Sequence, residues 1–151
     1  MSICSFIASD APLASVSPAR DYPLHINVDL GTIDDGGADD NYFLHPFLNV
    51  QDYSDKAYAV SLEWNYTEGR AKQIIDYIKA ALQETDVVEF WHVWLTDYYE
   101  FEDRPYIHRK TVSVQSLTAE HIRETDDAVI WNTPDPMYPE RPSFYCLTIT
   151  R

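Results

Sequence analysis

Residues 57–95 read AYAVSLEWNYTEGRAKQIIDYIKAALQETDVVEFWHVWL, and this stretch decides the fold class. Apolar and polar residues alternate over 58–66, which is the period of a strand with one buried face. Thr67 is a typical helix N-cap, and Glu68 suits the positive end of a helix dipole. Apolar residues then recur at helical spacing, at Ala71, Ile74, Ile75, Ile78 and Leu82. Because residues 87–95 are mostly β-branched and aromatic, the stretch predicts strand, helix, strand.

The sequence after residue 95 predicts a second half of the same kind. Residues 97–103 are acidic and aromatic, and strand composition resumes at 106–114, so we expect a hairpin with the preceding strand. A second helix should begin at the N-cap Thr118 and end near residue 124, and a closing strand should follow at 144–149. The order predicts an α+β fold with a ferredoxin-like βαββαβ core at 57–151, in which two helices cover one face of an antiparallel sheet.

Residues 1–56 should add strands to this core within a single domain spanning residues 1–151. A short apolar strand is expected at 3–8, and a second, alternating strand at 24–30. The acidic segment 34–41 contains four Asp and two Gly, which indicates an exposed loop. Residues 42–50 then lead back as an edge segment. We expect the N-terminal strands to extend an edge of the sheet or to cover its open face.

The charge of the chain limits the partners that it can have. Twenty-five acidic and eleven basic residues give a formal net charge of −14. Such a field repels phosphate backbones and anionic lipid surfaces, so we expect neither a nucleic acid nor a membrane as partner. A basic protein or a metal cation remains compatible with it, and so does a charge that serves only solubility.

The termini and the cysteines favour a cytoplasmic protein. No apolar stretch approaches the roughly 20 residues of a membrane helix, and the first ten residues lack a basic leader. Cys4 and Cys146 each fall inside an expected strand, as is ordinary for buried thiols in a reducing compartment. A disulfide between these two strands is the alternative.

No motif assigns a catalytic residue, a metal or a cofactor. The Asp-rich segment lacks the ligand spacing of an EF-hand, and the five histidines lack zinc-site spacing. Nucleophile-elbow and glycine-rich phosphate motifs are also missing. Whether the chain is an enzyme stays open, and the balance is against it.

One set of residues could bind a ligand on the open sheet face. His92 and His108 fall on the two strands of the expected hairpin, and Glu63 falls nearby on another strand of the same sheet. Together they would suit a divalent metal or acid–base chemistry. The alternative is that His92 is a hydrogen-bonded core residue and His108 a surface residue, because a register slip of one position reverses each face.

The aromatic tip of the expected hairpin is the second candidate. Aromatic anchors bordered by charge are a common design of protein interfaces. The residues that would contact a partner are Trp94, Asp97, Tyr98, Tyr99 and Phe101. The alternative is that these rings only thicken a small core.

Four segments resemble an uncharacterised family of short bacterial proteins. They are IASDAPL at 7–13, DDGGADD at 34–40, LEWNYTEGRAKQ at 62–73 and FWHVWL at 90–95. The resemblance implies a bacterial cytosolic origin, and it brings no assigned activity.

These observations favour a non-enzymatic binding or regulatory module that engages a basic protein, as an inhibitor or immunity protein does. A small-molecule-binding or metal-dependent enzyme that uses the open sheet face is the alternative. A structural homo-oligomer, with sheets paired through faces or edges, is a third possibility.

Overall fold

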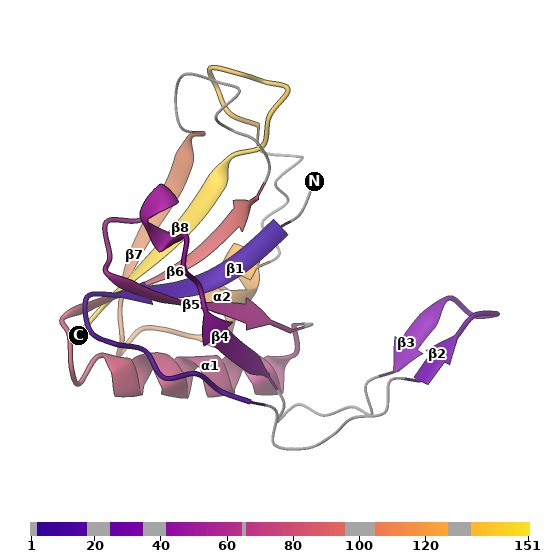
Figure 1. The fold of residues 1–151 in the computed structure, drawn as a ribbon, viewed down its shortest axis with the longest axis horizontal. Helices are drawn as coiled ribbons and strands as arrows, with labels where there is room; N and C mark the ends of the chain where they lie inside the picture. Colours follow the sequence, from indigo (N-terminus) through magenta and orange to yellow (C-terminus); the bar gives the residue numbers. More distant parts are fainter. Residues whose placement is uncertain (1–2, 18–24, 35–41, 65, 96–104, 127–133) are drawn as a thin grey trace.

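A computed structural model of the chain describes residues 3–17, 25–34, 42–64, 66–95, 105–126 and 134–151. Within them, a six-stranded mixed sheet is joined by two α-helices and a separate two-stranded sheet (Figure 1). The expected α+β class is therefore confirmed. In chain order, the elements are β1 (Ile3–Ser9), β2 (His25–Asn27), β3 (Thr32–Asp34), β4 (Phe43–Pro46), η1 (Val50–Asp52), β5 (Tyr58–Glu63), α1 (Glu68–Ala81), β6 (Val87–Trp94), β7 (Ile107–Ser113), α2 (Ala119–Asp126) and β8 (Phe144–Thr150).

The sheet has the strand order β4-β5-β1-β6-β8-β7, which differs from the expected ferredoxin-like order. From β5 onward the chain does run strand, helix, strand, strand, helix, strand. However, β6 and β7 do not form a hairpin, because β8 lies between them, antiparallel to β6 and parallel to β7. The reason lies in the side chains: β8 buries residues on both faces, whereas β7 carries exposed Arg109 and Lys110, which suit an edge.

The N-terminal strand β1 occupies the middle of the sheet, and the expectation that it extends an edge is wrong. It pairs antiparallel with β5 on one side and with β6 on the other. Its last five residues are all buried, which requires neighbours on both sides. Since β5 and β6 both run opposite to β1, the β5–α1–β6 unit is a parallel pair of strands split by β1. The segment expected at an edge, residues 42–50, does contain the edge strand β4.

Both helices begin at the expected caps. The Thr67 hydroxyl accepts a hydrogen bond from the Arg70 backbone N–H at 3.1 Å, at the start of α1. At the start of α2, the backbone N–H of Thr118 donates to Nδ1 of His121 at 3.0 Å, so His121 fills the place that Glu takes in a capping box. Neither helix, within the described part of the chain, has the length and apolarity to cross a bilayer.

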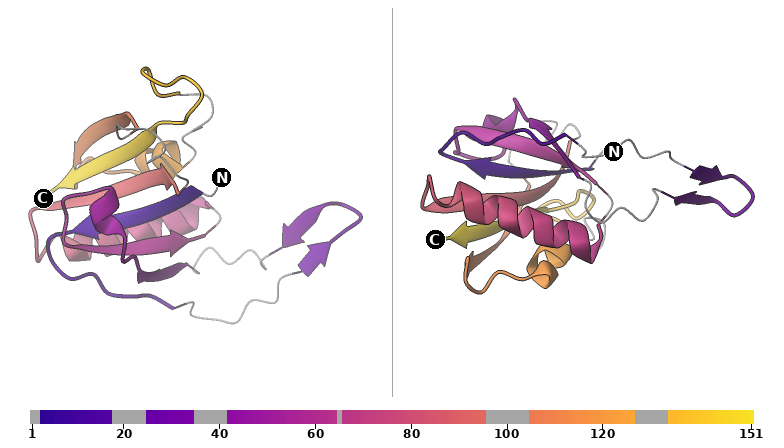
Figure 2. Two further views of the ribbon diagram at one scale, coloured as in Figure 1. Left: turned by 45° about the horizontal axis from the view of Figure 1, so that its top comes forward. Right: turned by 90° about the horizontal axis from the view of Figure 1, so that it is seen from below.

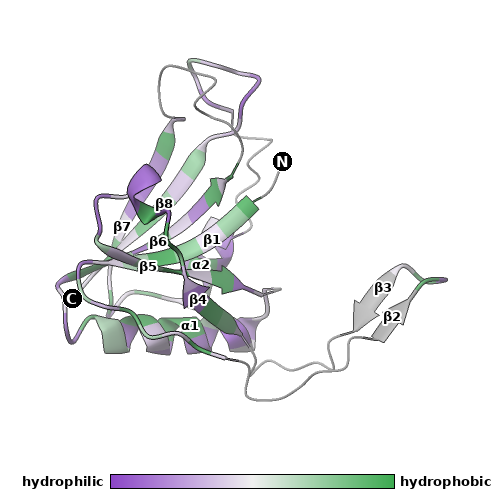
Figure 3. Cartoon of the chain, viewed as in Figure 1, coloured by the Kyte–Doolittle hydropathy of each residue, from purple (hydrophilic) through white to green (hydrophobic). Residues whose placement is uncertain are grey.

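The sheet has two buried faces with different covers. The helix face packs against α1 and α2 and includes Ile7, Phe90 and Leu147. The opposite face includes Phe6, whose ring stacks on that of Trp91 with centroids 5.8 Å apart, and it is covered by the segment around η1. Figure 2 shows α1 lying across the strands. Figure 3 shows that β1, which lies between β5 and β6, is mostly hydrophobic. The face that was expected to be open is thus partly filled by residues 47–53.

The β2–β3 hairpin stands apart from the six-stranded sheet (Figures 1 and 2). Its turn includes Gly31, whose φ of +63° lies in the left-handed region that favours glycine. Val28 and Leu30 in the same turn are largely exposed. The strand expected at 24–30 is therefore shorter than expected, and its second half is the turn.

Candidate functional site

A row of polar and aromatic side chains crosses the helix face near one end of the sheet. Strand pairing places Ser5 beside His92, His92 beside Tyr145, and Tyr145 beside His108. Two residues further along β1, β6 and β8, the neighbouring row is apolar and consists of the core residues Ile7, Phe90 and Leu147. The strands therefore change from an apolar to a polar composition as they approach this end.

The row is tied to the end of α2 by hydrogen bonds. The Ser5 hydroxyl oxygen lies 2.9 Å from Nδ1 of His92 and donates to Oδ1 of Asp126 at 3.1 Å. The indole N–H of Trp64 donates to the same carboxylate oxygen, also at 3.1 Å. Ser5 and His92 are buried, and Asp126 is half-buried. Two residues that are distant in sequence, Ser5 and Trp64, thus hold the Asp126 carboxylate in a fixed orientation.

These residues line a pocket of about 810 Å³ at the end of β1, β5 and β6, which we call the sheet-end pocket. Its described lining contains two carboxylates and neither Lys nor Arg. The lining consists of Ile3, Cys4, Ser5, His45, Pro46, Phe47, Ser61, Leu62, Glu63, Trp64, Tyr66, His92, Leu95 and Asp126.

The second carboxylate lies nearer the solvent. Glu63 Oε1 is 3.4 Å from Nε2 of His45, and most of the Glu63 side chain is exposed. Burial, together with the negative charge of Glu63, raises the pKa of the Cys4 thiol to about 11. Cys4 is therefore a neutral thiol at physiological pH and offers no preformed thiolate nucleophile. The ring of Trp64 meets that of Tyr66 edge to face, with centroids 5.6 Å apart, and adds an aromatic wall.

The arrangement can accommodate a cation. The Ser5 hydroxyl has one proton and already contacts both His92 and Asp126, so the three groups form a closed hydrogen-bonded set. An oriented carboxylate beside aromatic rings, with neither Lys nor Arg in the described lining, is a favourable environment for a positive charge.

No family model, no curated protein and no solved structure matches this sequence. The resemblance to a family of short bacterial proteins therefore gains no support from these comparisons. The argument for function consequently depends on the geometry of this pocket and on charge.

The structure brings together two of the three residues expected on the sheet face. Glu63 and His92 both line the sheet-end pocket, although strand parity puts them on opposite faces. His108 lies on the edge strand β7, where its ring stacks on that of Tyr145 at 4.8 Å. Among the described residues, His, Cys, Asp and Glu form no group of three or more that could hold a metal.

The structure places only one residue of the expected aromatic tip. Trp94 is 3% exposed, and its indole N–H donates to the Pro142 carbonyl at 2.9 Å, so its ring belongs to the core. Asp97, Tyr98, Tyr99 and Phe101 lie outside the described residues.

Sequence reasoning missed Asp126 and the two residues whose side chains donate hydrogen bonds to its carboxylate, Ser5 and Trp64. One signal was present, because Ser5 interrupts an otherwise apolar strand. A polar residue at a buried strand position needs a partner, and that partner had to be polar too.

Proposed function

We propose that this protein is a non-enzymatic binding module for a basic protein, and that its sheet-end pocket receives a Lys or Arg side chain of that partner. The observation that carries the proposal is the pair of carboxylates, Asp126 and Glu63, in a described lining that has two histidines but neither Lys nor Arg. Opposite charge across an interface speeds association and selects the partner.

The surroundings of the pocket support a protein partner. Ile3 and Leu95 both line it, and both are large apolar side chains that are exposed, by 59% and 41%. An apolar rim beside a charged pocket is typical of a surface that binds another protein. Leu95 also lies two positions before Asp97, the first residue of the segment 97–101 in which the sequence predicts partner contacts.

The net charge of the whole chain also favours a basic partner. A net charge of −14 attracts a basic protein over distances comparable with the Debye length, about 8 Å at physiological salt. The complex is therefore expected to weaken as salt is added. A homo-oligomer would not have this property, because two copies of an acidic chain repel each other.

The proposal can be tested with a defined probe. We would titrate the ¹⁵N-labelled protein with a capped pentapeptide in which one arginine is flanked by leucines, and follow the Trp64 indole and Ser5 amide signals. The arginine peptide should move these signals, and a peptide with glutamine in place of arginine should bind at least threefold more weakly. Asp126→Asn and Glu63→Gln should remove this preference.

A matched control separates the pocket from general charge. Asp76→Asn removes an exposed carboxylate of α1 that does not line the pocket, and it should leave the preference for arginine unchanged. Equal binding of the two peptides, or an unaltered preference in Asp126→Asn protein, would overturn the proposal. Tenfold tighter binding of a free diamine than of the peptide would assign the pocket to a small organic amine instead.

A further inference from the structure

A second hollow lies at the other end of α1 and is separate from the sheet-end pocket. It has a volume of about 620 Å³ and lies between the end of α1 and the loop that joins β7 to α2. Trp64 and Tyr66 of the sheet-end pocket precede the first residue of α1. Leu82 of the second hollow comes directly after the last residue of α1. A 14-residue helix is roughly 21 Å long, so a ligand in one hollow does not reach the other.

The floor of this hollow is apolar. Leu82 and Leu117 are buried members of the core that lies under the helices, and the partly buried Val114 packs against the same core. Apolar floors with a few polar groups at the side are typical of small-molecule sites. The C-terminal end of α1 therefore leaves part of the core accessible from outside.

The polar lining has the opposite charge to that of the sheet-end pocket. Lys79, Arg151, Gln83 and Gln115 supply two cationic and two amide side chains, and the described lining contains neither Asp nor Glu. In a chain with a net charge of −14, this is a local reversal of charge. The amide groups of the two glutamines can each donate hydrogen bonds to an anion.

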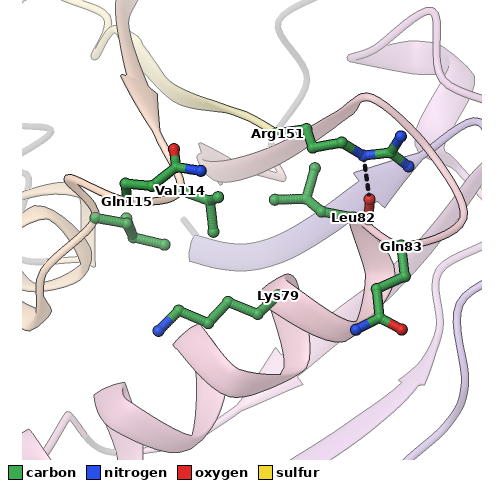
Figure 4. A pocket seen from close by; sticks show the side chains of 7 residues that line it. Lys79, Leu82, Gln83, Val114, Gln115 and Arg151 are labelled. Carbon is green, nitrogen blue, oxygen red and sulfur yellow. Dashed lines mark hydrogen bonds between the residues drawn. The ribbon is translucent and has the colours of Figure 1, made fainter.

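The two cations differ in how they are held. Arg151 is fixed at the end of α1, because its Nε donates to the Leu82 carbonyl at 2.8 Å and its Nη1 lies 3.4 Å from the Asp86 carboxylate. Lys79 has no ion-pair partner among the described residues. Figure 4 shows the Lys79 side chain running along the hollow, with Val114 and Gln115 on the opposite side. Its ammonium group is therefore the cation that a ligand can pair with.

We propose that this hollow binds an organic monoanion with an apolar body, such as an aryl or alkyl carboxylate. The carboxylate pairs with Lys79 and accepts from the Gln115 amide, while the apolar part covers Leu82, Val114 and Leu117. This site does not depend on the binding of a basic partner at the sheet-end pocket.

The test uses 2-naphthoate, with the uncharged 2-naphthamide as its isosteric comparison. In an NMR titration of the labelled protein, 2-naphthoate should shift the amide signals of Leu82, Gln83 and Gln115, with a Kd on the order of 1 mM for a ligand of this size. The Trp64 indole signal should not move. 2-Naphthamide should bind at least threefold more weakly, because it lacks the ion pair.

Two lysine variants make the test specific. Lys79→Met keeps the aliphatic stem and removes the charge, so it should abolish the preference for naphthoate over naphthamide. Lys72→Met removes a lysine that lies two turns earlier on α1 and pairs with Glu68, and it should keep the preference. The proposal fails if both compounds bind equally to the wild type, if Lys79→Met keeps the preference, or if the shifted signals lie elsewhere.

Discussion

Arg141 and Asp135 form a buried ion pair, in which Nη2 of Arg141 lies 2.9 Å from Oδ2 of Asp135 and each side chain is 3% exposed. The same carboxylate oxygen accepts from Nε of Arg141 at 3.1 Å, and the other oxygen accepts from the Met137 backbone N–H at 2.8 Å. The pair thus organises the loop between α2 and β8. That loop also supplies the Pro142 carbonyl that binds the indole of Trp94.

We expect Asp135→Asn to lower the free energy of unfolding by about 3 kcal/mol, because it leaves the Arg141 guanidinium buried without its counter-charge. Urea denaturation followed by tryptophan fluorescence measures this change. Glu68→Gln, which breaks an exposed pair with Lys72, is the matched control and should leave the midpoint nearly unchanged. A similar midpoint for both variants would contradict the role given to the buried pair.

The same carboxylate predicts how stability depends on pH. Burial alone would raise the pKa of Asp135, but hydrogen bonds from the backbone N–H groups of Tyr106 and Met137 and from Arg141 outweigh it and lower this pKa below its ordinary value of 3.8. A carboxyl with a lowered pKa stabilises the fold above its unfolded pKa, and this contribution is lost as pH falls through the folded value. Between pH 5 and pH 2, wild type should therefore lose more stability than Asp135→Asn. Parallel loss in the two proteins would show that other groups dominate.

The hydroxyl of Ser5 is expected to hold the site together. Ser5→Ala removes the hydrogen-bonding group between His92 and Asp126 in a buried position, and we expect it to cost about 1–2 kcal/mol. The Trp64 indole signal should also shift, because its acceptor Asp126 loses a partner. Ser113→Ala, which breaks an exposed hydrogen bond to Ser116, should have little effect on either measurement.

The local sequence pattern predicted the helices and most strands. The order of the strands and the contacts of the site depend on pairing between distant segments, and they could not be predicted. The caps at Thr67 and Thr118 and the stripe of α1 depend on neighbours within one turn, and all three are found in the structure. The order of strands depends on pairings between residues far apart in the sequence, and the local pattern of β1 does not show that β5 and β6 are its partners. The candidate site could only be half predicted for the same reason, because the Ser5 and Asp126 contact joins the two ends of the chain.

Both cysteines should be unreactive in the folded protein. They are free thiols, and burial raises the pKa of Cys146 to about 12 and that of Cys4 to about 11. Iodoacetamide at pH 8 should therefore label neither residue within the time that labels the guanidinium-unfolded chain completely, because the thiolate is the reacting form. Mass spectrometry of the two samples measures this. Rapid labelling of Cys4 in the folded state would mean that the sheet-end pocket is more open than the structure shows.

The central position of β1 makes a prediction about which parts of the chain fold together. A fragment of residues 57–151 should not fold, because removal of β1 leaves β5 and β6 without the strand that joins them. By contrast, residues 18–41 should be dispensable. Val16 and Leu44 exchange backbone hydrogen bonds of 2.8 and 2.9 Å, so the chain on either side of the excision is already adjacent.

The comparison is between the 57–151 fragment and a variant in which a four-residue Gly-Ser linker replaces residues 18–41. Circular dichroism and amide proton dispersion should show a folded protein for the linker variant, with a Tm within a few degrees of wild type, since loop-closure entropy changes only slowly with length. The fragment should show neither dispersion nor a cooperative thermal transition. A folded fragment would mean that β5 and β6 can close the sheet without β1, and the strand order described above would then be only one of two stable arrangements.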